Sequence, residues 1–329
     1  SAITSDIGAM LMGDSPLVSM YGIAGPPRPD ILVYCTNHGQ SVIRWFEYYG
    51  RHFEAPVFGL HPPASLREVT RIEVDLVVFQ TYRLIAKLES LTGRRLDQDR
   101  LAEVVGHAAR AADLWLEILR LARTVPSPLT FFDLLIHMSP MVVLRGTPEA
   151  VAYYTVLKAE LEDRIAHKQA AVPGERFRFY WEGPPIWCAL RPLAKLFLDH
   201  QVAVVASTFT RIGALEGLDP SNPIETTSRA YASNFTNRSE DTKAEFLISQ
   251  FHEFGVDGVI HHDGRTAPEH SNVRYGLQAR LRRATGLPSL VLEADTHDLR
   301  LFSMEQILSQ LQEFLEQQDR AQMRLAGKA

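Results

Sequence analysis

Histidine and carboxylate side chains gather in one short stretch of the second half of the chain. His261, His262 and Asp263 are consecutive, and His252 and His270 lie on either side of them. Imidazole and carboxylate groups together bind several divalent ions, and imidazole also exchanges protons near neutral pH. The alternative is a strand end whose alternating side chains include histidines. We predict no metal site, and we take His261 and His262 as candidates for acid–base chemistry.

Two further polar segments follow predicted strands. In residues 182–185, Gly183 allows a ligand to approach the backbone, and the start of the next helix favours an anion. The alternative is a plain strand-to-helix turn with rigid prolines. Residues 293–300 combine three acids, a histidine and an arginine, which is either a site or a surface ion pair between Asp298 and Arg300.

Several well-defined motifs are missing from the sequence. It contains no GxGxxG, no GxxxxGK[ST] and no GxSxG, so neither a dinucleotide fingerprint nor a phosphate-binding loop nor a nucleophile elbow is present. Cys35 and Cys188 are the two cysteines, too few for zinc or iron–sulfur spacing. Both lie among apolar residues, which predicts buried free thiols in a reducing compartment.

The elements that must position these residues alternate between strand and helix. In the first half, a βαβ unit with a right-handed crossover is expected from short apolar runs on either side of a helical pattern. A long helical region follows, broken near residue 92, and then a second helix. The strands are predicted at 30–35 and 56–60, and the helices at 41–51, 65–121 and 148–168.

The pattern of the second half predicts a doubly wound parallel sheet with helices on both faces. Strands are predicted at 177–181, 202–207, 258–261 and 289–292, with helices at 186–200, 242–254 and 271–285 and a last one announced by a capping box at 303–306. A polar linker at 171–175 predicts two domains, residues 1–172 with a helical insertion and residues 173–329. Ligands of such sheets bind beyond the carboxyl ends of the strands.

Composition excludes several classes of partner. The net charge of −5 gives no basic surface for nucleic acid, and no apolar run approaches the ~18 residues that cross a bilayer. The first residues have neither a basic region nor a sustained apolar run, so they do not indicate a signal peptide. A soluble, cytoplasmic protein is expected.

Several segments between about residue 6 and residue 315 occur in an order that is typical of one family. They are 36–37 with 42–45, 88–89 with 91–93 and 96–97, 180–187, 256–262 with 265–266, 286–298, and a closing helix at 303–314. Together they resemble the 2-hydroxyacyl-CoA dehydratase and benzoyl-CoA reductase family, in particular the 2-hydroxyglutaryl-CoA dehydratase D-component. The segment before residue 6 is short against that family, which indicates a truncated or tagged start.

The resemblance implies two flavodoxin-like α/β domains in a subunit that works as a heterodimer. In that family an ATP-dependent activator supplies one electron to a four-iron cluster, which passes it to a CoA thioester. The resulting ketyl radical loses a β-hydroxyl or, in the reductases, leads to ring reduction. Three cysteines of each subunit hold its cluster, and one iron stays open toward substrate, water or another non-cysteine ligand.

The positions that match these cluster ligands hold no cysteine. They fall near Gly8, at Gly39 and at Ala267, and glycine and alanine cannot replace the thiolates that stabilise such a cluster. Cys35 lies inside a predicted strand and Cys188 begins a predicted helix, so neither compensates. We therefore predict no cofactor in this chain and a 4Fe-4S cluster in a homologous, cysteine-bearing partner subunit.

Three functions remain open. The favoured one is an acyl-CoA-handling subunit of a heteromeric dehydratase (lyase) or reductase, with a pocket between the two domains. The second is a cluster-free enzyme that performs acid–base chemistry on an acyl-CoA, and the third is a non-catalytic scaffold subunit. The candidate residues are His38, Glu182 and His261 for catalysis, and Asn37, Arg265 and Asp295 for substrate binding.

Overall fold

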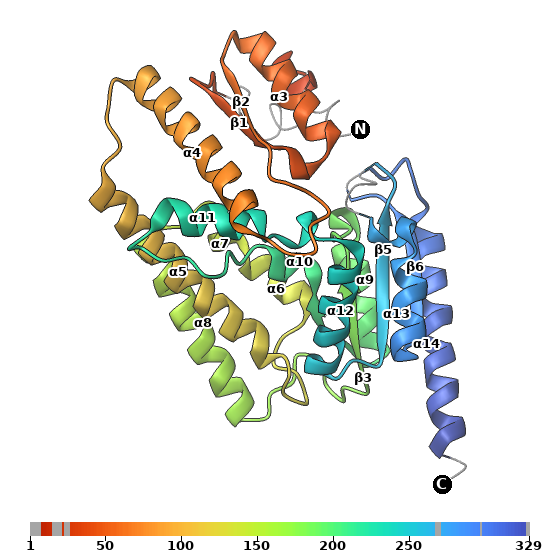
Figure 1. Cartoon of the computed structure of the whole chain (residues 1–329). Helices are drawn as coiled ribbons and strands as arrows, with labels where there is room; N and C mark the ends of the chain where they lie inside the picture. Colours follow the sequence, from red (N-terminus) through yellow and green to blue (C-terminus); the bar gives the residue numbers. More distant parts are fainter. Residues whose placement is uncertain (1–7, 15–21, 23–26, 267–270, 297, 327–329) are drawn as a thin grey trace. The chain divides into compact units, whose positions relative to one another are not determined.

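A computed structural model describes residues 8–14, 22, 27–266, 271–296 and 298–326. Contacts divide the chain into two units, Ser1–Leu101 with Ile224–Ser239, and Ala102–Pro223 with Glu240–Ala329. Each unit contains a parallel sheet with helices packed against it (Figure 1). The predicted α/β class with two parallel sheets is confirmed.

The first unit is built on the predicted βαβ unit. Strands β1 (Leu32–Cys35) and β2 (Val57–Leu60) pair in parallel, with Leu32 opposite Val57, and helix α3 (Gln40–Phe53) connects them. The short helix η1 (Thr36–His38) follows β1 directly.

Two longer helical segments complete the first unit. Helix α4 (Arg71–Thr92) packs beside β2, and α11 (Pro223–Ala232) and the short η3 (Phe235–Asn237) return to this unit from far along the sequence. Helix α4 begins behind Thr70, which forms a capping box with Glu73, and ends at Gly93 in the left-handed conformation.

The second unit contains a four-stranded parallel sheet in the order β4-β3-β5-β6. Its strands are β3 (Phe177–Glu182), β4 (Val202–Ser207), β5 (Gly258–Gly264) and β6 (Ser289–Ala294). The order runs outward from β3 to β4 on one side and through β5 to β6 on the other. The chain therefore changes direction between β3 and β5, and this is the switch point at which flavodoxin-like sheets bind ligands.

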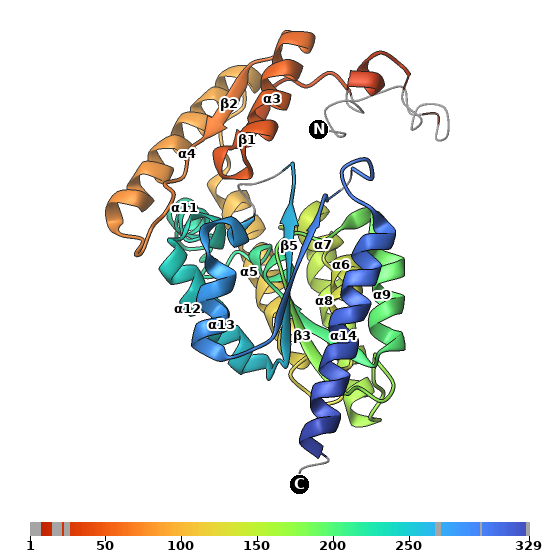
Figure 2. The same cartoon turned by 90° about the vertical axis from the view of Figure 1, so that its right-hand side faces the viewer.

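Helices cover both faces of this sheet, as predicted (Figure 2). On one face, Phe179 and Trp181 of β3 pack against aromatic residues of α6 (Phe131–His137), α9 (Leu190–Asp199) and α14 (Met304–Ala326). On the opposite face, Tyr180 contacts Phe251 of α12 (Glu240–Phe254), and α13 (Leu277–Thr285) packs beside α12. Alternation of side chains along β3 thus separates two aromatic layers.

The remaining elements of the second unit include several that the pattern did not predict. Helices α5 (Gln98–Leu121) and α8 (Pro148–Ala166) match predicted helical regions, although the first residues of α5 lie in the first unit. The short elements α7 (Ser139–Val143), η2 (Trp187–Ala189), α10 (Thr208–Ile212) and η5 (Asn272–Tyr275) are too short to show a hydrophobic period.

The two units do not follow the predicted division at residues 172 and 173. Most of α5, together with α6 to α8, groups with the second sheet, because buried residues of α5 such as Trp115 belong to that core. The indole nitrogen of Trp115 donates a hydrogen bond to the carbonyl oxygen of Thr210, 2.9 Å away, which joins α5 to α10. None of the helices in the described ranges combines the length and apolar character needed to cross a membrane.

Candidate functional site

Two buried ionisable side chains meet at the switch point of the second sheet. Glu182 ends β3, and His261 lies directly opposite it on β5. The His261 Nδ1 atom is 3.5 Å from Glu182 Oε2, and both side chains are only 1% exposed. Register places both on the same face of the sheet. The structure therefore brings together two of the three predicted catalytic residues.

A polar chain supports Glu182 from behind. Asn272, in η5, donates a hydrogen bond from Nδ2 to Glu182 Oε1 at 2.8 Å, and its own Oδ1 accepts one from Lys243 Nζ at 2.9 Å. Lys243 also pairs with Glu240 at the start of α12. Sequence reasoning missed Asn272 and Lys243, because nothing in a helical pattern distinguishes a residue that turns inward to a distant strand end.

Four buried atoms beside this chain make no hydrogen bond in the described part of the protein. They are Glu182 Oε2, both ring nitrogens of His261, and Nε2 of His262. Buried polar atoms are nearly always paired with protein, water or ligand groups. This cluster therefore has the capacity to bind a polar group that enters at the switch point.

A sharp turn after β3 fixes the neighbouring His262. Gly183 adopts φ +96°, and the carbonyl oxygen of Pro184 accepts hydrogen bonds from Trp181 Nε1 at 3.1 Å and from His262 Nδ1 at 2.7 Å. Since a carbonyl only accepts, the proton of neutral His262 must sit on Nδ1, which leaves Nε2 as an acceptor. Burial lowers the pKa of His262, although the Pro184 carbonyl opposes this shift.

Gly183→Ala is expected to lower the free energy of unfolding by about 1–3 kcal/mol. A Cβ atom at this position would lie 2.8 Å from the carbonyl oxygen of His262, in a backbone conformation that alanine rarely adopts. Gly217→Ala is the matched control, because Gly217 also has positive φ but a Cβ there meets nothing within 4 Å. Urea unfolding of both variants separates the steric contact from the backbone cost, and equal losses would contradict the close approach.

Buried His262 should also make stability depend on pH. Its folded-state pKa is lowered from 6.5, so below that value the unfolded chain binds the proton more readily and stability falls. We expect His262→Gln to reduce the loss of stability between about pH 7.5 and about pH 5.5, measured as the shift of the urea midpoint. His52→Gln, at an exposed position on α3, serves as the control. An unchanged pH dependence in the His262 variant would refute the assignment.

Asp295, a predicted substrate-binding residue, organises the loops at the end of the sheet. Its Oδ2 accepts hydrogen bonds from the amide and hydroxyl of Thr266, and its Oδ1 accepts one from the amide of Asp298. Arg300 binds Asp298 with two side-chain nitrogens, which lowers the pKa of that carboxyl to about 2. The surface ion pair expected between Asp298 and Arg300 is therefore present.

Arg265, the other predicted binding residue of this unit, is exposed. It donates to the carbonyl oxygen of Leu301 at 2.9 Å and approaches Glu293 at 3.5 Å. Its guanidinium is thus engaged with the loop after β6. A role in binding substrate stays a prediction.

The remaining predicted residues belong to the first unit. Asn37 donates from Nδ2 to the hydroxyl of Thr236 at 3.3 Å, while its Oδ1 is buried without a hydrogen-bond partner in the described residues. The backbone of His38 lies in η1, and its side chain is outside the described atoms. Gly39 is buried with φ +93° and precedes α3, and Gly8 lies in a short helical turn. Ala267 lies outside the described residues.

The thiols do not fit a four-iron cluster held by three cysteines. The 329 residues contain two cysteines, and both are free. Cys35 is buried inside β1, as predicted, but Cys188 is exposed in η2, so the prediction of two buried thiols was wrong for Cys188. Partial burial raises the pKa of both thiols, which disfavours the thiolate that iron requires. Among the described residues, no three His, Cys, Asp or Glu side chains are grouped to hold a metal ion.

The fold and the switch-point residues define an α/β protein with a flavodoxin-like second sheet. The family model described as 2-hydroxyglutaryl-CoA dehydratase, D-component, matches residues 1–317, and the chain belongs to this family. The resemblance predicted from the sequence is confirmed.

Characterised relatives are named as parts of enzymes that act on CoA thioesters. One of them, from the benzoyl-CoA reductase of Thauera aromatica, is 29% identical, over 89% of this chain and 71% of that protein. The alpha subunit of (R)-2-hydroxyisocaproyl-CoA dehydratase from Clostridioides difficile is 28% identical, over 88% and 71%. The alpha subunit of (R)-2-hydroxyglutaryl-CoA dehydratase from Acidaminococcus fermentans is 26% identical, over 88% and 60%.

Proposed function

We propose that this chain is an acyl-CoA-handling subunit of a heteromeric dehydratase- or reductase-like complex and carries no iron–sulfur cluster of its own. The family match along residues 1–317 supports the acyl-CoA class, and the names of the relatives support a subunit role. The observation that carries the absence of a cluster is the thiol count. Two cysteines, one in β1 and one in η2, cannot supply three thiolates.

In this proposal the redox chemistry takes place in a homologous, cysteine-bearing partner served by an ATP-dependent activator. The present chain binds or shapes the site for the thioester with polar groups at its strand ends. Asn37, Glu182, His261, Arg265 and Asp295 are the proposed contacts or supports. Asp295 acts indirectly, because its oxygens already hold the loops after β5 and β6.

The experiment is native mass spectrometry of this chain coexpressed with a cysteine-bearing family member. We expect a one-to-one heterodimer in which iron and sulfide accompany the partner, and no iron on this chain purified alone. Monomers or homo-oligomers only would reject the heteromeric proposal. Stoichiometric iron and sulfide on this chain alone would reject the cluster-free part. A heterodimer in which this chain contributes nothing to acyl-CoA binding would favour a scaffold role.

A second candidate function is supported by the buried Glu182–His261 pair. In a cluster-free acid–base enzyme, His261 Nε2 accepts a proton from an acyl-CoA while Nδ1 faces the carboxylate. The carboxylate then stabilises the imidazolium that forms, and the same proton returns from Nε2 to the product. Asn272 holds the carboxylate in place through Oε1.

Exchange of the α-hydrogens of acetyl-CoA with deuterated water tests this second function. The isolated, iron-free chain should catalyse the exchange, and His261→Gln should slow it by about 10²–10⁴-fold. His252→Gln, on α12 and away from the pair, is the control. No exchange by the wild-type chain would leave the first function as the better explanation.

A further inference from the structure

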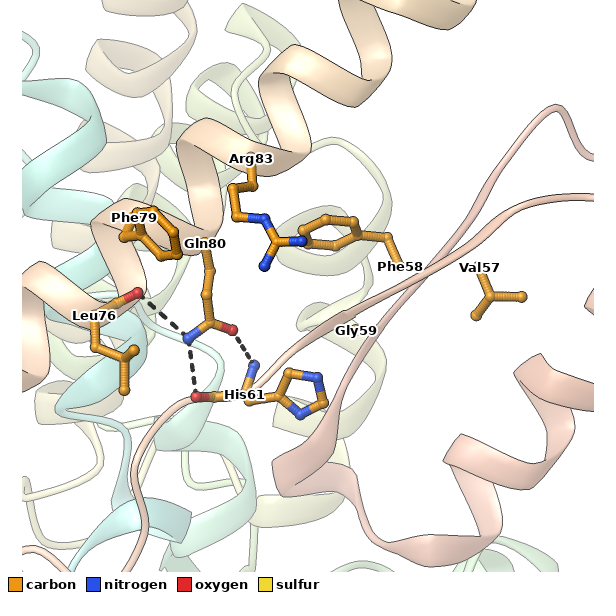
Figure 3. A pocket seen from close by; sticks show the side chains of 8 residues that line it. All are labelled: Val57, Phe58, Gly59, His61, Leu76, Phe79, Gln80 and Arg83. Atoms are coloured by element: carbon orange, nitrogen blue, oxygen red, sulfur yellow. Dashed lines mark hydrogen bonds between the residues drawn. The ribbon is translucent and has the colours of Figure 1, made fainter.

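A groove of about 440 Å³ lies within the first unit, between β2 and α4 (Figure 3). This volume is within the range of small-molecule sites, about 300–1,000 Å³. Four lining residues come from or follow β2, and four come from one face of α4, where a spacing of three and four residues aligns their side chains. The lining residues are Val57, Phe58, Gly59, His61, Leu76, Phe79, Gln80 and Arg83.

Gln80 fixes the two walls of the groove to each other. This side chain is 8% exposed, and its Oε1 accepts a hydrogen bond from the amide of His61 at 2.7 Å. Its Nε2 donates to the carbonyl oxygen of His61 at 3.1 Å and to that of Leu76 at 3.3 Å. The amide therefore pairs with the edge of the chain just after β2 as a neighbouring strand would. This closes that edge to an added strand and sets the height of α4 above the groove.

Gly59 provides the space in which two rings lie. A Cβ atom there would lie 2.8 Å from both the His61 Nε2 atom and the ring of Tyr34. The His61 and Tyr34 rings meet edge to face with centroids 6.3 Å apart. The absence of a side chain at Gly59 thus lets the His61 ring lie against the strand at the rim of the groove.

Arg83 gives the groove its charge. Figure 3 shows its side chain extending from α4 toward β2, and its guanidinium lies 5.8 Å from the centre of the Phe79 ring. No carboxylate lines the groove, and within the described ranges no acidic side chain forms an ion pair with Arg83. Phe79 itself is 59% exposed, so an aromatic face beside an arginine is open to solvent.

We propose that this groove binds the adenine nucleotide part of coenzyme A. An unpaired guanidinium is suited to a phosphate group, and exposed aromatic faces are suited to a flat purine. The inference rests on the proposed function for its choice of CoA among adenine nucleotides. It assigns Arg83 to phosphate and the Phe58 and Phe79 walls to the base.

Calorimetric titration of the full chain with adenosine 3′,5′-bisphosphate, CoA and inorganic phosphate tests the assignment. We expect the bisphosphate and CoA to bind, Arg83→Ala to weaken both by about 10- to 100-fold, and Phe79→Ala to weaken them by about 10-fold. Arg51→Ala, at an exposed position on α3, is the control for loss of one positive charge and should change neither. Arg83→Lys should recover part of the affinity.

The outcomes separate the groove from the proposed function. CoA binding that Arg83→Ala leaves unchanged would overturn the groove assignment while the acyl-CoA function stands. Inorganic phosphate binding as tightly as the bisphosphate would overturn the nucleotide assignment. No binding of CoA or the bisphosphate to the wild-type chain would overturn the groove assignment. If acetyl-CoA also failed to bind, both with and without a partner subunit, the proposed function would fail as well.

Discussion

Arg178→Met is expected to lower the free energy of unfolding by about 3–5 kcal/mol, the usual result of removing one partner from a buried ion pair. The Arg178 guanidinium donates to the carbonyl oxygens of Ala122, Thr124 and Phe254, and it pairs with Glu175. Both charged side chains are nearly buried, 9% and 2% exposed. Methionine fills similar space but leaves the carboxylate and three carbonyl groups without their donor.

Equilibrium urea unfolding measures this effect, and Arg123→Ala is the matched control. Arg123 pairs with Glu253 between neighbouring segments, but its side chain is 47% exposed. An exposed pair contributes about 0–1 kcal/mol, so the control should unfold close to the wild type. Similar losses for the two variants would contradict the role of Arg178 as the junction between β3, α12 and the loop after α5.

Glu182→Ala is expected to cost about 2–4 kcal/mol: about 1–3 kcal/mol for the orphaned Asn272 donor, and about 1 kcal/mol for the lost apolar volume. Glu182 is fully buried, and Asn272 is itself held by Lys243 and cannot turn to water without breaking that bond. The change also removes the group that faces His261 Nδ1.

Glu182→Gln separates the two roles of this side chain. Glutamine keeps an oxygen for Asn272, so we expect most of the stability to return, while the negative charge opposite His261 is lost. NMR titration of the His261 ring then shows whether the carboxylate affects its protonation. Glu293→Ala, on the exposed side of β6, should change unfolding little. A Glu182→Ala variant as stable as the wild type would show that the Asn272 hydrogen bond contributes nothing to the fold.

The strands were the part of the fold that the sequence predicted best. Val202–Ser207 is an uninterrupted buried strand, and its apolar run between polar turns leaves few other solutions. Residues 258–261 were predicted correctly but too short, because β5 continues through His262 to Gly264 with polar residues that its burial pattern tolerates. Hydrophobic pattern alone ends a strand where the side chains become polar.

The site was predicted only in part. Strand-end position correctly singled out Glu182 and His261 as neighbours in space, since carboxyl ends of parallel strands meet at one edge. The same reasoning could not tell that Asp295 would bind its own loop or that Asn272 would reach Glu182, because loop geometry sets both contacts. The groove of Arg83 and Phe79 was missed, since exposed residues on an amphipathic helix carry no signal of a nearby strand.

The sequence by itself determined the α/β class, the family and the shortage of thiols, because these depend on residue types and their order. Tertiary structure decided which polar groups share a buried space, how α11 joins the first unit while α12 joins the second, and where α4 meets β2. The physical reason is that these contacts join residues far apart in the chain. Their energies depend on burial and hydrogen-bond geometry, which local sequence patterns do not specify.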